Sequence, residues 1–140
     1  MSTENETMKA QAVVFSQPKQ VSLQALELCP PGADDIEVNV LYSGISTGTE
    51  RLLWDGSMPA FPGMGYPLVP GYEAVGVITG AGEHSPYQVG QRVFVPGAHC
   101  WTQGVHSLFG GSAAHLVVPH HRVVEVDQIV KMVERLTHAA

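Results

Sequence analysis

The chain has 140 residues, the size of one domain, and 44% of them are hydrophobic while only 14% are charged, which excludes extensive disorder. The formal net charge of −6 argues against nucleic acid as the main partner, because no basic stripe is available to neutralise phosphates. Two cysteines do not make a disulfide framework and favour a reducing, cytoplasmic compartment. No apolar run approaches the roughly 18 residues of a membrane-spanning helix, so we expect no transmembrane segment.

The first third of the chain predicts strands. Residues 1–8 are polar and acidic, and we expect them to be a disordered N-terminus. Strands are predicted over 9–16 and 20–28, on either side of a turn at Pro18, because apolar and β-branched residues are frequent or alternate there. The clearest strand covers 36–42. Its apolar face is expected to hold Ile36, Val38, Val40 and Tyr42.

The remainder predicts short strands separated by irregular loops. One helical turn is expected over 50–55, and the prolines and glycines of 56–71 exclude regular structure there. A second irregular loop is expected over 96–111. Further strands are predicted over 74–79, 91–95, 113–118 and 122–126. The many short strands indicate an all-β barrel or sandwich with short helical turns.

Two glycine-rich turns in the middle of the chain each follow or precede apolar sequence and contain a carboxylate beside a hydroxyl. The first is the run SGISTGTE at 43–50, and the second is PGYEAVGVITGAG at 70–82. Between them lies a loop, 54–70, that is rich in proline, glycine, methionine and aromatic residues. Two strand ends and an apolar loop predict the floor and the wall of one pocket.

The second run, followed by VGQRV at 89–93, resembles the catalytic domain of medium-chain alcohol dehydrogenases. That family carries Gly-His-Glu, then a strand, then Val-Gly-Asp-Arg-Val, and the resemblance implies a GroES-like β-barrel over 9–126. The segment 43–71, with LFGG at 108–111, is similar to the bacteriochlorophyllide a dehydrogenase subgroup. Those enzymes use NAD+ to oxidise the 3-(1-hydroxyethyl) group of the pigment to 3-acetyl in bacteriochlorophyll biosynthesis. The resemblance implies that reaction, with a chlorophyllide-type tetrapyrrole as substrate.

The chain departs from the family at the metal positions. Catalytic zinc in the family is held by a cysteine at the strand end and a histidine before the glutamate. Here these positions carry Ser46 or Thr47, and Tyr72, and of the four cysteines of the structural zinc lobe only Cys100 is present. Because hydroxyls are poor replacements for thiolate and imidazole, we expect no zinc.

The chain also departs from the family in its length. No Gly-x-Gly-x-x-Gly follows a strand in these 140 residues, so the NAD-binding domain of the family is missing from this sequence. We therefore expect the chain alone to be inactive. Segment 127–140 is expected to be the returning C-terminal strand, joined at about Asp127 after excision of that domain. A simple truncation, in which 129–136 begins a free amphipathic helix, is the alternative.

Five residues are candidates for catalysis: Thr49, Glu50, Tyr72, Glu73 and His99. The carboxylates suit a proton relay or orientation of the substrate hydroxyl, or else turn caps and ion pairs with Arg51 and Arg92. The two hydroxyl groups suit hydrogen bonds to the reacting oxygen, or else a turn hydroxyl and a half-buried aromatic. The histidine suits a base or an axial ligand of a pigment-bound magnesium, or else an exposed surface residue.

Five apolar side chains of the long loop are candidates for binding a large flat macrocycle: Trp54, Met58, Phe61, Met64 and Tyr66. The alternative is that the loop packs a small core of its own.

Two other functions fit the same sequence, namely a stand-alone tetrapyrrole-binding module without catalysis and a co-chaperonin-like barrel that assembles into a ring.

Overall fold

The computed structural model describes residues 8–102, 104–107 and 109–138, so nearly all of the terminus expected to be disordered lies outside the described residues. Within these ranges, seven strands, two helices and one 3-10 turn follow one another. The strands are β1 (Lys9–Gln17), β2 (Gln20–Glu27), β3 (Asp35–Ser43), β4 (Ala74–Ala81), β5 (Arg92–Val95), β6 (His115–Pro119) and β7 (Val124–Glu125). The others are α1 (Thr47–Asp55), η2 (His120–Arg122) and α2 (Val126–His138).

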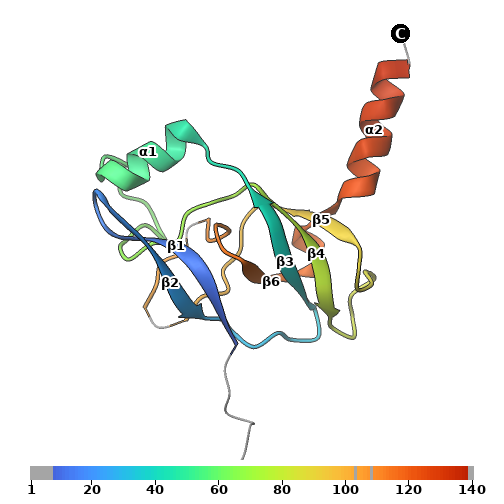
Figure 1. Cartoon of the computed structure of the whole chain (residues 1–140), viewed down its shortest axis with the longest axis horizontal. Coiled ribbons are helices and arrows are strands. Elements are labelled where there is room, and N and C mark those ends of the chain that lie inside the picture. Colours follow the sequence, from blue (N-terminus) through green and yellow to red (C-terminus); the bar gives the residue numbers. More distant parts are fainter. Residues whose placement is uncertain (1–7, 103, 108, 139–140) are drawn as a thin grey trace, which may run out of the picture.

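The strands form two antiparallel sheets, a β1–β2 hairpin and a five-stranded sheet in the order β6-β3-β4-β5-β7 (Figure 1). Isolated bridges join β1 to the rest of the molecule, from Ala12 to Ala113 and from Phe15 to Leu68. The predicted β-rich fold is therefore confirmed. The described strands pair as two sheets, and no closed barrel is found among them.

The alternation predicted for 36–42 holds in the first half of β3 and fails at its end. Ile36 and Val38 are fully buried, whereas Tyr42 is 76% exposed. The register between β3 and β4 shifts between Val40 and Tyr42, which is the mark of a β-bulge. An extra residue moves the following side chains to the other face of a strand, so the prediction of a buried Tyr42 is wrong.

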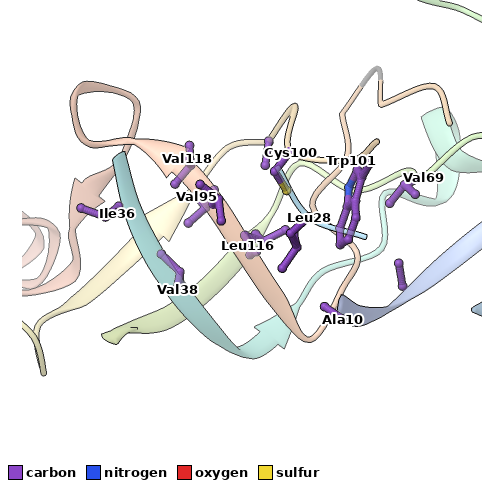
Figure 2. Close-up of a cluster of buried hydrophobic side chains, with 14 of the residues drawn as sticks. Ala10, Leu28, Ile36, Val38, Val69, Val95, Cys100, Trp101, Leu116 and Val118 are labelled. Atoms are coloured by element: carbon purple, nitrogen blue, oxygen red, sulfur yellow. The ribbon is translucent and has the colours of Figure 1, made fainter. Parts of the chain in front are cut away.

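The main core lies between the hairpin and the five-stranded sheet (Figure 2). Val38 of β3 and Leu116 of β6 are fully buried there, and Leu28 lies beside Cys100 and Trp101 of the second irregular loop. The indole Nε1 of Trp101 donates a hydrogen bond of 2.9 Å to the carbonyl of Gly110. A tryptophan buried with its one polar atom satisfied anchors this otherwise irregular loop.

Helix α1 covers a second, smaller core on the far side of β1. Phe15, Leu53 and Leu68 form its buried centre. The helix has nine residues rather than the single turn predicted, because it begins at Thr47, directly after the extended Ser46. It ends at Gly56, whose left-handed conformation lets its N–H bond to the carbonyl of Leu52. A short connection, residues 44–46, links the end of β3 to the first turn of α1 (Figure 1).

The C-terminal segment is a helix and not the expected strand. Helix α2 projects away from the sheets in Figure 1, and none of its residues is buried. Ile129, Val133 and Leu136 recur at helical spacing, which outweighs the β-branched composition. The neighbouring strand predicted over 122–126 is also shorter and contains only Val124–Glu125. Neither helix in the described part of the chain has the length and hydropathy of a membrane span.

Candidate functional site

An apolar groove runs between β1, the end of β3 and helix α1. It consists of two adjoining cavities of about 490 Å³ and about 330 Å³ that share Val13, Ile45 and Ser112 in their linings. The larger cavity is also lined by Phe15, Val21, Thr47, Glu50, Arg51, Trp54 and Pro70. The smaller cavity is also lined by Gln11, Leu23, Ser43, Ala113 and Ala114. Either volume lies in the range of small-molecule sites, and we call the pair the groove.

Helix α1 presents one face to the groove. Its lining residues Thr47, Glu50, Arg51 and Trp54 are spaced by three, one and three positions, which places them on one side of a helix. The opposite wall is β1, whose central residues 12–15 are apolar on both faces. Val14 points into the main core, while Val13 and Phe15 face the groove and α1. The two-sided burial of β1 thus positions the groove between the two cores.

Glu50 is the buried acidic group of the groove, with 7% of its surface exposed. Burial raises its pKa, the negative charge of Glu73 adds to the increase, and a backbone hydrogen bond at Ser46 opposes it. Its Oε1 has no hydrogen-bond partner among the described residues. Because Glu50 lines the larger cavity, its carboxyl group can exchange a proton with a molecule that enters the groove.

Thr49 and Tyr72 lie next to each other behind this face of α1. The phenol of Tyr72 donates to the hydroxyl of Thr49 over 3.4 Å, and the Tyr72 ring packs edge-on against Phe109 with centroids 4.9 Å apart. Neither residue is among those that line the groove. Their contact joins the first turns of α1 to the end of the 56–71 loop, so they hold the helix in place rather than face the cavity.

Glu73 lies beside the end of β3. Its carbonyl accepts a hydrogen bond of 2.7 Å from the N–H of Gly44, and its carboxylate fills the space where a side chain at position 44 would lie. The Glu73 side chain is exposed and acts on Glu50 through charge. The structure therefore brings together four of the five catalytic candidates, Thr49, Glu50, Tyr72 and Glu73.

His99 lies elsewhere. It lines a separate cavity of about 170 Å³ together with Asp35, which begins β3, while the groove is lined by Ser43, which ends the same strand. Its Nδ1 is 3.4 Å from the hydroxyl of Ser107, and its side chain is exposed. His99 is not among the residues that line either cavity of the groove, so the structure does not place it with the other four candidates.

The five binding candidates divide into three groups. Trp54 lines the groove and is 38% exposed. Met58, Met64 and Tyr66 pack against the second core, and the Tyr66 hydroxyl donates to the carbonyl of Leu53. Phe61 is exposed to the same extent as Trp54 but is not among the lining residues. Only Trp54 of the five is positioned to touch a molecule in the groove.

The described residues contain no group of three or more histidine, cysteine or acidic side chains positioned to hold a metal ion. Ser46 and Thr47 stand at the start of α1, and the Tyr72 hydroxyl is directed to Thr49. The absence of zinc stays a prediction that metal analysis has to test.

Several residues of the groove were not predicted from the sequence. Val13, Phe15, Ile45 and Ser112 belong to three separate segments that only the tertiary fold brings together. The signal available for Ile45 was a large apolar residue within a glycine- and serine-rich turn, and the structure leaves it 75% exposed. Nothing in the local sequence of Ser112 distinguishes it from an ordinary loop serine.

A family model of the alcohol dehydrogenase GroES-like domain matches residues 32–128. The chain belongs to this family. The match begins before β3 and extends into α2, so this GroES-like domain carries β3, α1, Tyr72 and Glu73 within the family region.

Two curated relatives show which subgroup of the family the chain is similar to. The domain is 48% identical over 123 residues to the 2-desacetyl-2-hydroxyethyl bacteriochlorophyllide A dehydrogenase of Rhodobacter capsulatus, covering 88% of this chain. It is 47% identical over 124 residues to the protein of the same name from Cereibacter sphaeroides, covering 86% of this chain. The predicted resemblance to the bacteriochlorophyllide dehydrogenase subgroup is confirmed. The chain spans 39% of the length of each of these relatives.

Solved structures share the fold. The CAD protein of Helicobacter pylori complexed with NADP(H) superposes with a TM-score of 0.71 at 18% identity, over 88% of this chain and 43% of that one. A thermostable alcohol dehydrogenase of Pyrobaculum aerophilum gives 0.65 at 26% identity, over 84% and 41%. The rspB dehydrogenase of Escherichia coli complexed with NADH gives 0.65 at 25% identity, over 86% and 39%. The GroES-like domain thus has the architecture found within longer dehydrogenases.

Proposed function

We propose that this chain is the substrate-binding part of a nicotinamide-dependent dehydrogenase that oxidises the 3-(1-hydroxyethyl) group of a bacteriochlorophyllide to a 3-acetyl group. The observation that carries the proposal is the groove, which combines an apolar wall for a flat ring with a buried carboxyl group at α1. The 48% identity to a relative named for this substrate supports the choice of pigment.

Within the groove we assign separate roles to the lining residues. Trp54, Phe15 and Ile45 provide apolar contact for the macrocycle. Glu50 receives the proton that the hydroxyethyl oxygen loses, because burial moves its pKa upward, nearer to neutral pH. The Thr49–Tyr72 contact keeps α1, and with it Glu50, in position.

The described strands contain no pairing of the kind that binds a dinucleotide. All pairings between the named strands are antiparallel, whereas a dinucleotide site needs a parallel strand-helix-strand unit with a glycine-rich turn. We infer that the hydride acceptor is bound by another part of the dehydrogenase. The 140 residues are then expected to bind the pigment and, when NAD+ is added, to leave it unoxidised.

A titration of the purified chain with 3-hydroxyethyl bacteriochlorophyllide tests the proposal. We expect quenching of tryptophan emission and a shift of the pigment absorption on binding. Ile45→Glu places a charge in the apolar groove and should weaken binding strongly, because a bound pigment would cover that charge without a partner. Val89→Glu is the matched control, since Val89 is 67% exposed and does not line the groove. Equal affinity of both variants would reject the groove as the site.

A further inference from the structure

One positive charge stands at the edge of the groove. Among the described residues that line either cavity, Arg51 is the only lysine, arginine or histidine. It follows Glu50 on α1 and is exposed, while the residues opposite it on β1 and β2, namely Phe15 and Val21, are apolar. A guanidinium beside an apolar surface is partly shielded from water, which strengthens its attraction for an anion.

Arg51 is not neutralised by the protein. No ion pair within 4.0 Å is found for its guanidinium in the described part of the chain. Asp55 lies one helical turn further on, and the charge of Arg51 contributes to the lowered pKa of that carboxyl, behind larger contributions from Ser57. The Asp55 carboxylate is already bonded to the N–H and the hydroxyl of Ser57, with the N–H bond 2.9 Å long. The guanidinium therefore keeps its donors for a ligand.

We propose that Arg51 binds the free propionate carboxylate of the pigment and so makes the site selective for the chlorophyllide over the esterified pigment. This inference rests on the proposed function and adds that the groove recognises the propionate carboxylate of the substrate. A chlorophyllide carries a free propionic acid group. In the esterified pigment the same group is bonded to a long-chain alcohol. Guanidinium and carboxylate match as a forked pair of charge-assisted hydrogen bonds.

The other charges near the groove restrict where that carboxylate can lie. Glu50 is buried in the lining, and Glu73 acts on it through charge. Either would repel a propionate placed beside it, and the chain as a whole carries a formal net charge of −6. Arg51 is then the point at which an anionic edge is attracted. Because the macrocycle is rigid and carries its hydroxyethyl and propionate groups on different rings, fixing the propionate also fixes the orientation of the reacting group.

The test compares two pigments that differ in one charge. The purified chain is titrated with 3-hydroxyethyl bacteriochlorophyllide a and with its propionate methyl ester, followed by tryptophan quenching. We expect the free acid to bind about three- to tenfold more tightly, the range for a partly exposed charge-assisted pair. Added salt should weaken binding of the acid and leave binding of the ester unchanged.

Arg51→Gln should bind the acid and the ester equally, and Arg51→Lys should keep part of the preference. Arg122→Gln is the matched control, because it removes the same charge from an exposed arginine that lines the separate His99 cavity. It should keep the full preference. Equal binding of acid and ester by the unchanged protein, or a preference that persists in Arg51→Gln, would overturn the role of Arg51 alone. Failure of both pigments to bind would overturn the proposed function and this inference together.

Discussion

The phenol of Tyr72 and the hydroxyl of Thr49 are 3.4 Å apart, and their contact connects two segments separated by 22 intervening positions. Thr49 lies in the first turns of α1, one residue before Glu50, while Tyr72 follows the irregular 56–71 loop. Tyr72, where the family resemblance implies a histidine, thus directs its hydroxyl to Thr49. The role left for Tyr72 is to fix the helix that carries the groove-lining residues.

Tyr72→Phe is expected to lower the free energy of unfolding only slightly. The ring still packs on Phe109, and a separation of 3.4 Å is longer than a typical hydroxyl hydrogen bond, so the loss should be about 0.5 kcal/mol. Urea denaturation measures it. Tyr42→Phe serves as the control because Tyr42 is 76% exposed, and it should change nothing measurable. A loss above about 1.5 kcal/mol would show that the Tyr72 hydroxyl makes a stronger contact than this one.

Trp54→Ala should weaken pigment binding, whereas Phe61→Ala should not. Both side chains are 38% exposed, but only Trp54 lines the groove. Burying an aromatic side chain against a ligand contributes about 1.5 kcal/mol or more, so the dissociation constant of Trp54→Ala should rise at least roughly tenfold. Pigment absorption serves as the readout, since it does not depend on tryptophan. A larger effect from Phe61→Ala would move the binding surface from the groove to the 56–71 loop.

Glu50→Gln is expected to change the pH dependence of stability. A carboxyl whose folded-state pKa is raised above its ordinary value of 4.5 favours folding when protonated, so its contribution is lost as the pH rises through the folded-state pKa. The variant should therefore gain stability relative to the unchanged protein as the pH rises above the ordinary value of 4.5. Denaturation curves at several pH values give the comparison. Glu134→Gln, at an exposed position on α2, should show no such trend.

The two cysteines should differ in reactivity. Cys100 is 2% exposed, and burial raises the pKa of its thiol to about 11, whereas Cys29 is partly exposed. Because the thiolate is the reactive form, iodoacetamide at about pH 8 should modify Cys29 first and Cys100 only after denaturation. Mass spectrometry of tryptic peptides distinguishes them. Modification of Cys100 in the native protein at a rate equal to that of Cys29 would contradict its buried environment.

Local sequence was sufficient for the strands and insufficient for the groove. Alternation of apolar residues predicted β3, and the proline and glycine content of 56–71 correctly predicted irregular structure. Tyr42 was misplaced because a bulge depends on the partner strand β4 rather than on β3 itself. The strand expected within 127–140 is part of α2, because no described strand pairs with it and its apolar spacing suits a helix.

The candidate site, too, was predicted only in part from local sequence. Thr49, Glu50, Tyr72 and Glu73 were predicted together, since two motifs at strand ends bring them close. His99 was grouped with them on chemistry alone, and the fold places it in a separate cavity. The wall formed by Val13, Phe15 and Ser112 depends on bridges between β1 and later segments, which no local pattern encodes.

Gly71 restricts how the two irregular loops beside the groove can change in sequence. Its φ of 102° lies in the left-handed region, and a Cβ at this position would lie 2.0 Å from the hydroxyl of Ser112. The carbonyls of Pro70 and Gly71 accept hydrogen bonds from Ser112 and Gly111, so this point ties the first irregular loop to the second. Because Ser112 also lines the groove, any side chain introduced at position 71 must displace the floor of the site. The two loops are therefore not free to diverge independently, and redesign of one for a different ring would require compensating changes in the other.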